Sequence, residues 1–211
     1  MTHQDLKKYR RYGPRVQLIT RDGCAVVQKS YSQAVLPVRI MGFFLIAWER
    51  FIYSRLAGLP GIPDPMPCPD RLTLVTRFMG GGNLKEASHI PGAPYFDSLK
   101  RLIAAMHQRG VIHLDLRNRR NYGIDEQGRP YLVDFATCLY FPWNVPPRKV
   151  FEAIDWMGFA KVKHKLQPGL LDEREKRMLS LGTRLSSWWL PPRALRLIRN
   201  IGKNYRDHMK K

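Results

Sequence analysis

Cysteines and long apolar runs are both scarce in this 211-residue sequence. Its three cysteines, Cys24, Cys68 and Cys138, form no CxxC pair, so the sequence encodes neither a disulfide framework nor a zinc site. The longest apolar run covers residues 40–48, far short of the roughly 20 residues that cross a bilayer. The chain opens with polar and basic residues instead of a signal peptide. We therefore expect a protein of the reducing cytosol, with peripheral contact as the form of membrane association left to consider.

Acidic residues are scarce as well, because 17 Asp and Glu stand against 36 Lys and Arg. The formal net charge is +19 and the pI is near 10.3. Such a charge attracts polyanions, which include nucleic acid, an anionic membrane surface and a phosphorylated glycolipid. Nucleic acid is the least expected of these partners, because the sequence has neither an aromatic RNA-binding motif nor zinc-finger spacing. Hydrophobic residues make up 44% of the chain, enough for a globular core.

Strand and helix patterns divide the chain at a run of glycines. Alternation predicts strands at 16–20 and 24–31, joined by a turn whose Asp-Gly dipeptide favours a hairpin. A mainly apolar helix is predicted at 37–56 and a further strand at 71–78. The glycines at 80–82 then indicate a hinge between a strand-rich N-terminal lobe and a helical remainder. No Lys-Ser or Lys-Thr pair follows them, which argues against a P-loop.

Glu49 is the one acid of the predicted helix at 37–56, and it lies on an apolar face. Its neighbours one turn away are large and mainly apolar: Leu45, Ile46, Ile52 and Tyr53. An isolated buried carboxylate would cost several kcal/mol, so Glu49 needs a cationic partner, and Lys29 on the strand at 24–31 is the candidate. The alternatives are that Lys29 is solvated on the outer face of its hairpin and that Glu49 lies at the edge of the apolar stripe beside Arg50.

The stretch 111–138 contains the residues with the clearest chemistry. His113, Asp115 and Asn121 occupy a polar turn, a short hairpin follows, and Asp134 comes directly after the returning strand. The hairpin brings Asp134 back toward Asp115, so two carboxylates and an amide converge. This arrangement suits phosphoryl transfer, with Asp115 as the base and with Asn121 and Asp134 as magnesium ligands.

Two further helices and a basic tail complete the chain. A helix at 96–109 leads into the polar turn, and a later helix places Asp155 within its apolar face, so Asp155 also needs a specific partner. Beyond the paired Trp188 and Trp189, a basic amphipathic helix is predicted around 193–206. This pattern is typical of a membrane-interface element. The alternative is an ordinary last helix that packs its apolar side on the domain.

Taken together, these residues resemble those of the protein-kinase-like fold. His113-Leu114-Asp115 is similar to the catalytic-loop signature, residues 132–136 to the magnesium-binding DFG segment, and residues 26–29 to the VAIK strand. Glu49 is placed like the glutamate that pairs with the strand lysine, and Asp155 like the helix acid that anchors the catalytic loop. The resemblance covers most of the chain except the last 40 or so residues.

The resemblance implies an α+β, bilobal fold, with a small antiparallel-sheet N-lobe that includes one helix and a mainly helical C-lobe. It divides the chain into an N-lobe at 1–79, a C-lobe core at 80–170 and a basic extension at 171–211. It also implies that ATP and Mg²⁺ are the cofactors, that Lys29, held by Glu49, contacts the nucleotide phosphates, and that Phe78 and Met79 contact adenine. His113 and Asp155 would support the catalytic loop around Asp115.

The sequence departs from the kinase pattern mildly at Ala136, which replaces the glycine of DFG, and more clearly at two other places. The family's asparagine follows its aspartate by five positions, where this chain has Arg120; Asn121 is one position later and Asn118 two earlier. Asn121 fits better because it opens the following strand. Gly13 stands alone where a glycine-rich loop is expected, so backbone amides near Gly13 would cover the phosphates together with basic side chains. The candidates for these are Arg10, Arg11 and Arg15.

The short chain, which lacks an APE-like motif, resembles the small RIO-like and lipopolysaccharide-core sugar kinases that act near the inner membrane. We therefore expect an ATP-dependent kinase that phosphorylates a hydroxyl of a lipopolysaccharide-core sugar or other anionic glycolipid, in the cytoplasm or at the inner face of the membrane. One alternative is a RIO-like protein Ser/Thr kinase. The other is a pseudokinase that serves as a basic RNA- or membrane-binding module. The isolated His89, His107 and His164 are assigned no function.

Overall fold

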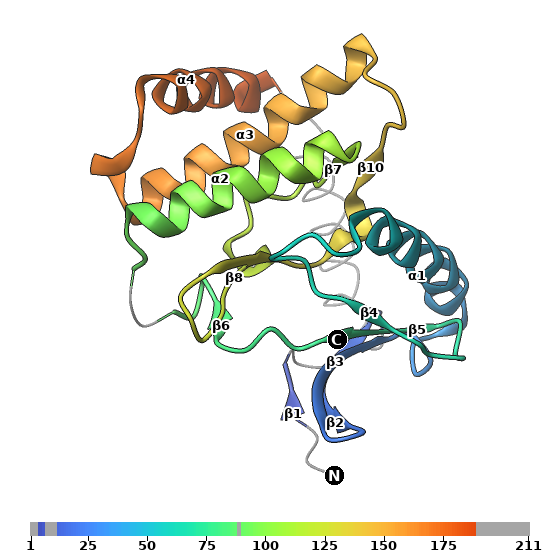
Figure 1. Cartoon of the computed structure of the whole chain (residues 1–211). Coiled ribbons are helices and arrows are strands. Elements are labelled where there is room, and N and C mark those ends of the chain that lie inside the picture. Colours follow the sequence, from blue (N-terminus) through green and yellow to red (C-terminus); the bar gives the residue numbers. More distant parts are fainter. Residues whose placement is uncertain (1–3, 7–11, 88–89, 189–211) are drawn as a thin grey trace, which may run out of the picture.

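The computed structural model describes residues 4–6, 12–87 and 90–188, and these residues form two lobes (Figure 1). The first lobe is a five-stranded antiparallel sheet of order β1-β2-β3-β5-β4, with one long helix against it. Its elements are β1 (Gln4–Asp5), β2 (Arg15–Arg21), β3 (Cys24–Ser30), α1 (Leu36–Leu56), β4 (Pro65–Met66) and β5 (Thr73–Arg77). The fold is α+β, as the sequence predicted.

Strand β3 lies at the centre of this sheet and therefore holds its side chains firmly. The tight turn before it has Asp22 and Gly23 at φ values of 50° and 76°, a geometry that Asp-Gly adopts readily. Lys29 on β3 lies opposite Val16 of β2 and Leu74 of β5. Helix α1 begins with a proline in its first turn and buries Ile46, Glu49 and Ile52 on one side.

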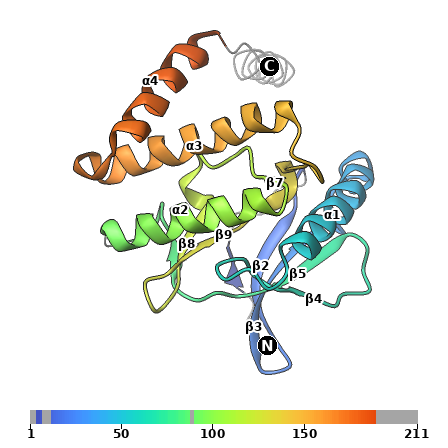
Figure 2. The ribbon, with the colours of Figure 1, turned by 45° about the horizontal axis from the view of Figure 1, so that its top comes forward.

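The second lobe is mainly helical and also contains two small sheets. Helix α3 lies between α2 and α4 in both ribbon views (Figure 2). The elements are β6 (Gly82–Asn83), α2 (Ala93–Gln108), β7 (Val111–Ile112), η1 (Arg119–Asn121), β8 (Tyr122–Ile124), β9 (Pro130–Leu132), η2 (Phe135–Thr137), β10 (Leu139–Tyr140), α3 (Pro146–Leu166), η3 (Pro168–Leu170) and α4 (Glu173–Trp188). β6, β8 and β9 form one sheet, and β7 pairs with β10.

The glycine run at 80–82 joins the lobes, but it is held more firmly than a free hinge. Gly82 pairs with Ile124 in the β6–β8 ladder. A Cβ on Gly81 would lie 1.9 Å from the carbonyl oxygen of Ile124, so only glycine fits there. The Tyr131 hydroxyl donates to the Gly80 carbonyl at 3.2 Å. The second half of the connection therefore belongs to the sheet of the C-lobe.

Several boundaries differ from the sequence-based expectations. Helix α2 begins at Ala93 instead of residue 96, because Pro94 suits a first helical turn. Part of the predicted extension at 171–211 is helix α4, whereas the predicted amphipathic helix around 193–206 and Trp189 lie outside the described residues. Within the described part, no helix combines the length and the apolar character needed to span a bilayer.

A buried ion pair attaches α4 to the C-lobe. Lys163 of α3 donates to Glu175 of α4 at 2.8 Å, and the two side chains are only 7% and 6% exposed. Lys100 of α2 donates to the other oxygen of Glu175 at 3.2 Å. One carboxylate therefore ties together three helices.

Replacing Lys163 with Ala should lower the free energy of unfolding by about 3 kcal/mol, because a buried carboxylate loses its closest partner. Lys176→Ala on the same helix is the matched control, since Lys176 pairs with the exposed Glu173. Urea unfolding of both variants measures the difference. Equal stabilities for the two variants would contradict the role assigned to Glu175.

Candidate active site

Lys29 joins the two lobes through two hydrogen-bonded carboxylates. Its Nζ donates to Glu49 Oε2 at 2.8 Å and to Asp134 Oδ1 at 2.9 Å. The side chain of Lys29 is 14% exposed, that of Glu49 2% and that of Asp134 38%. The predicted pair of Lys29 and Glu49 is thus present, and Lys29 does not lie on a solvated face. Asp134 is the most accessible carboxylate of the three-residue group.

The surroundings of Lys29 raise its pKa and so stabilise its positive charge. Burial lowers its pKa, but the negative charges of Glu49 and Asp134 and the hydrogen bonds to them outweigh burial, so the pKa lies above its ordinary value. A raised pKa means that the stabilisation from this ammonium is present below about pH 10.4 and is lost only at higher pH. Lys29 is therefore a fixed cation across the physiological range.

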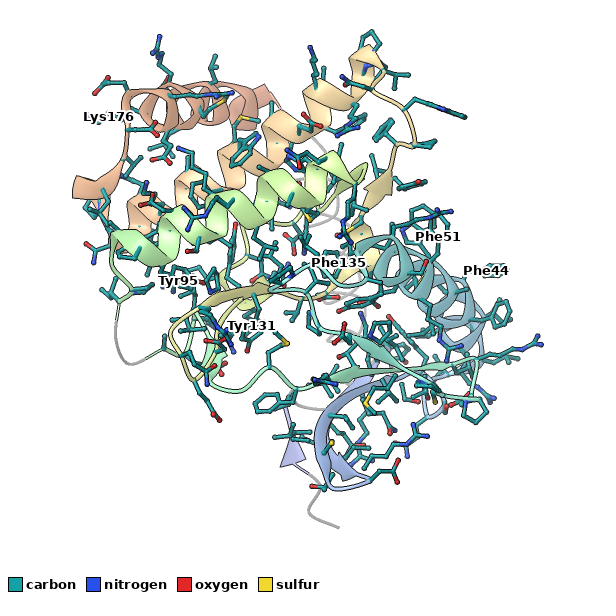
Figure 3. The ribbon with its side chains drawn as sticks, in the orientation of Figure 1. Phe44, Phe51, Tyr95, Tyr131, Phe135 and Lys176 are labelled. Carbon is teal, nitrogen blue, oxygen red and sulfur yellow. The ribbon has the colours of Figure 1, made fainter. Side chains whose placement is uncertain are left out.

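Phe135 connects this ion-pair group to helix α1 and to the loop at 113–121. Its backbone N–H donates to the second oxygen of Glu49 at 3.2 Å. Its ring packs against Tyr53 of α1 and against His113, with centroid distances of 5.1 and 5.0 Å. Phe135 itself is fully buried, and Figure 3 shows it between α1 and the C-lobe. The position of Glu49, and with it that of Lys29, therefore depends on the segment that follows Asp134.

Asp134 occupies a left-handed backbone conformation, with φ 70° and ψ 67°. A non-glycine residue adopts this conformation at a cost of order 1 kcal/mol, so its surroundings must hold it there. Val133 supplies part of that support, because its N–H donates to the Asn121 carbonyl at 3.0 Å and its carbonyl accepts from His113 Nε2 at 3.1 Å. The hairpin thus places Asp134 beside the Asn121 segment.

Asp115 lies within a compact polar cluster. Asn121 Nδ2 donates to both the carbonyl oxygen and Oδ2 of Asp115, each at 3.0 Å. Arg117 Nε lies 3.7 Å from Asp115 Oδ1, and the side chains of Asp115 and Arg117 are 34% and 65% exposed. Asp115 is thus held by an amide on one side and faces solvent beside a cation.

The two candidate asparagines use their side-chain oxygens differently. Asn118 Oδ1 accepts from the backbone N–H of Arg120 at 3.2 Å and so caps the η1 turn. The Nδ2 of Asn121 is committed to Asp115, and its Oδ1 meets only a long contact of 3.5 Å from Asn118 Nδ2 among the hydrogen bonds of the described residues. Asn121 therefore has the more available oxygen.

Asp155 of α3 fixes the backbone of the loop before Asp115. Its two oxygens accept from the N–H groups of His113 and Leu114, each at 2.7 Å, and Oδ2 also contacts His107 Nε2 at 2.9 Å. Asp155 and His113 are both fully buried. Leu114 has a φ of 62°, a strained value for this residue type that the paired carboxylate stabilises. The sequence predicted that Asp155 needs a specific partner, and this partner is a pair of backbone amides.

Two residues of this support were not identified from the sequence. His107 is 5% exposed and satisfied by Asp155, so it is a core residue of the loop support. Gly158 is one helical turn from Asp155, and a Cβ there would come within 2.9 Å of the Arg117 nitrogen and the Leu116 carbonyl carbon. The spacing Asp-x-x-Gly on a helix was the available signal, because it places both residues on one face.

The residues expected to contact the nucleotide lie in connections next to strands of the N-lobe sheet. Gly13 lies in the connection from β1 to β2, and a Cβ added to it would meet no atom within 4 Å. Phe78 and Met79 are half-buried at the end of β5, where the Phe78 N–H donates to the Ala25 carbonyl at 3.1 Å. Arg15 is already paired with Asp5 at 3.1 Å, whereas Arg10 and Arg11 lie outside the described residues.

Comparison with known proteins identifies the architecture. No protein-family model and no curated protein matches the sequence. Two solved structures of the Rio2 kinase from Chaetomium thermophilum are similar in fold. The one in complex with ADP, Mg²⁺ and phosphoaspartate shares 18% identity at a TM-score of 0.58, over 76% of this chain and 55% of that one. The other shares 17% identity at a TM-score of 0.56, over 79% and 60%.

The chain has the protein-kinase-like fold. It spans 55% to 60% of the length of these two Rio2 kinases. In the kinase-like arrangement, β3 carries Lys29, α1 carries Glu49, and the segment from β7 to η2 carries Asp115, Asn121 and Asp134.

Replacing Asp155 with Ala should lower the free energy of unfolding by roughly 3–5 kcal/mol, because two buried amides and an imidazole N–H lose their acceptor. Asp155→Asn keeps one acceptor oxygen, so it should lower the free energy of unfolding by less. Urea unfolding measures both variants, and Asp97→Ala on the exposed face of α2 serves as the control. An Asp155→Ala variant as stable as the control would show that the carboxylate does not support the loop.

Proposed function

We propose that this protein is an ATP- and Mg²⁺-dependent phosphotransferase that uses a hydroxyl as acceptor. The observation that carries the proposal is the double hydrogen bond of Lys29 to Glu49 and Asp134, next to a separate pair of Asp115 and Asn121. The first group would bind the nucleotide phosphates, and the second would receive the acceptor. The lobes at 1–79 and 80–170 would each contribute one side of this site.

The side chains fit a magnesium–nucleotide complex. Mg²⁺ prefers oxygen ligands and is often bound by one or two protein groups together with phosphates and waters. Asp134 offers an accessible carboxylate and Asn121 an available amide oxygen. No cluster of three or more His, Cys, Asp and Glu side chains suited to a metal occurs among the described residues. These residues therefore suit a magnesium site in which phosphate oxygens supply the remaining ligands. When bound, the metal would neutralise charge on the phosphates.

Asp115 is the proposed base. The acceptor hydroxyl would give its proton to Oδ1 or Oδ2 of Asp115 while its oxygen forms the new bond to the γ-phosphorus and ADP leaves. Asn121 orients this carboxylate through its Nδ2, and Lys29 would shift from Asp134 toward the phosphates. His113 is fully buried, so it positions the loop instead of touching the substrate. Gly13, Phe78 and Met79 are the proposed contacts to phosphate and adenine.

For the acceptor, we propose an anionic glycolipid, such as a core sugar of lipopolysaccharide. The support is the net charge of +19 and the position of Arg117, a mostly exposed cation 3.7 Å from the proposed base. An acceptor with its own phosphate or carboxylate would be drawn to this cation. The likeness to Rio2 kinases favours a second candidate, a protein acceptor.

Mass spectrometry of the lipopolysaccharide core from cells with and without the protein separates the two acceptors. The glycolipid proposal predicts a core that lacks one phosphate (about 80 Da) when the protein is absent. An unchanged core, together with labelled protein in extracts incubated with ATP, would favour the protein acceptor instead.

Two aspartate variants test the division of the site. Asp115→Asn should lower the rate of phosphoryl transfer at least a hundredfold, since general-base catalysis typically contributes about 10²–10⁴. It should still gain thermal stability from Mg²⁺-ATP. Asp134→Asn should lose both the transfer and most of this Mg²⁺-dependent stabilisation, which reaches about 2.7 kcal/mol at a hundredfold excess of ligand over Kd.

Asp97→Asn, on the exposed side of α2, is the matched control and should behave as wild type. ATP turnover with unchanged rate in Asp115→Asn would remove Asp115 as the base. Wild-type protein that gains no stability from Mg²⁺-ATP would point to the pseudokinase alternative.

A further inference from the structure

The N-terminal half of α1 exposes a continuous apolar side. Leu36 is 67% exposed, Ile40 56%, Met41 53% and Phe44 64%. Leu36, Ile40 and Phe44 recur at intervals of four, so they lie along one side of the helix. The opposite side carries the buried Ile46 and Glu49. We name the four exposed residues the α1 apolar surface.

This surface points away from the active site. Phe44 projects from the outer side of α1, whereas Phe135 lies inward, between α1 and the C-lobe (Figure 3). The ring of Phe43 packs edge-on against Phe44 at 5.3 Å, which extends the apolar area. Residues 33–48 contain no acid, and their one charged residue is Arg39, which is also exposed. An apolar strip beside a cation therefore faces outward.

A second exposed apolar group lies on elements that adjoin α1. Trp143, in the connection from β10 to α3, is 74% exposed, and Val150 in the first turns of α3 is 66% exposed. The neighbouring Lys149 is exposed as well. The rings of Phe51 in α1 and Tyr140 in β10 are in contact, with a centroid distance of 5.2 Å. The two exposed apolar groups therefore belong to α1 and to the segment that follows β10, the strand against which α1 packs. Both ribbon views place α1 and this connection on the same side of the molecule (Figures 1 and 2).

We propose that the α1 apolar surface is the site at which this protein binds an anionic lipid bilayer. Exposed apolar areas of this kind mark interaction sites, and aliphatic and aromatic side chains flanked by cations enter the boundary between headgroups and acyl chains. Each basic residue near an anionic membrane adds attraction. The net charge of +19 favours such a surface and opposes a second copy of the same chain. Trp143 would occupy the headgroup level.

Membrane binding by α1 is independent of the proposed phosphotransferase activity, because binding to vesicles needs neither ATP nor an acceptor. It would nevertheless hold the protein at a membrane surface, where a glycolipid acceptor resides. Helix α1 also carries Glu49, so the element that touches lipid would be the one that holds Lys29.

The experiment compares two substitutions that are matched in side chain and in exposure. Ile40 is 56% exposed on α1, and Ile90 is 57% exposed in the connection from β6 to α2. Ile40→Glu and Ile90→Glu in the full chain remove the same apolar group and add the same charge. Co-sedimentation with phosphatidylcholine vesicles that contain about one third phosphatidylglycerol measures the partition coefficient. Ile40→Glu should lower it about tenfold or more, because apolar burial is lost and a charge would have to enter the interface. Ile90→Glu should change it about twofold at most.

Three results would overturn the proposal. They are equal losses in the two variants, wild-type binding to pure phosphatidylcholine that matches binding to the anionic vesicles, and a dimer in sedimentation velocity that dissociates in Ile40→Glu alone. Both variants should unfold at the same temperature as the wild type, because both side chains are exposed. Thermal unfolding checks this, so that a difference in vesicle binding cannot come from misfolding. Phe44→Ser, which adds no charge, should reproduce the loss and would contradict the proposal if it bound as wild type.

Discussion

The ammonium of Lys29 is the interaction on which the site depends, because it bridges a carboxylate from each lobe. Glu49 belongs to α1 and Asp134 to the segment after β9, and Lys29 itself comes from the central strand of the N-lobe sheet. A buried carboxylate such as Glu49 would be strongly unfavourable without this cation. The Phe135 N–H on the second oxygen of Glu49 completes the connection. The geometry of the proposed phosphate site thus depends on one charged group.

A second carboxylate, Asp155, has the corresponding role within the C-lobe. It fixes two successive backbone amides and so holds Leu114 in a strained conformation directly before Asp115. Gly158 allows α3 to approach this loop closely. The loop is therefore shaped by a buried helix, whereas the side chains of Asp115 and Arg117 remain accessible. Rigid support behind exposed functional groups is consistent with the proposed acceptor site.

The sequence predicted the pair of Lys29 and Glu49, whereas the contact of Lys29 with Asp134, which lies 105 residues away, was not predicted. Glu49 stood within an apolar helical face, which required a cation, and the hairpin between Asn121 and Asp134 fixed where Asp134 returned. The two-residue strands β1 and β6 were not predicted, since they are too short to show alternation. The role of His107 depends on a contact with Asp155, 48 residues away, that no local pattern encodes. The restraint on Gly81 likewise comes from a distant carbonyl.

A crystal structure with a non-hydrolysable ATP analogue and Mg²⁺ would show whether Lys29 binds the nucleotide phosphates. In that structure, Lys29 Nζ should leave Asp134 for a phosphate oxygen while keeping Glu49, and the side-chain oxygens of Asp134 and Asn121 should be the protein groups that hold the metal. A nucleotide bound elsewhere, or a Lys29–Asp134 contact that persists with the analogue bound between the lobes, would contradict this proposal.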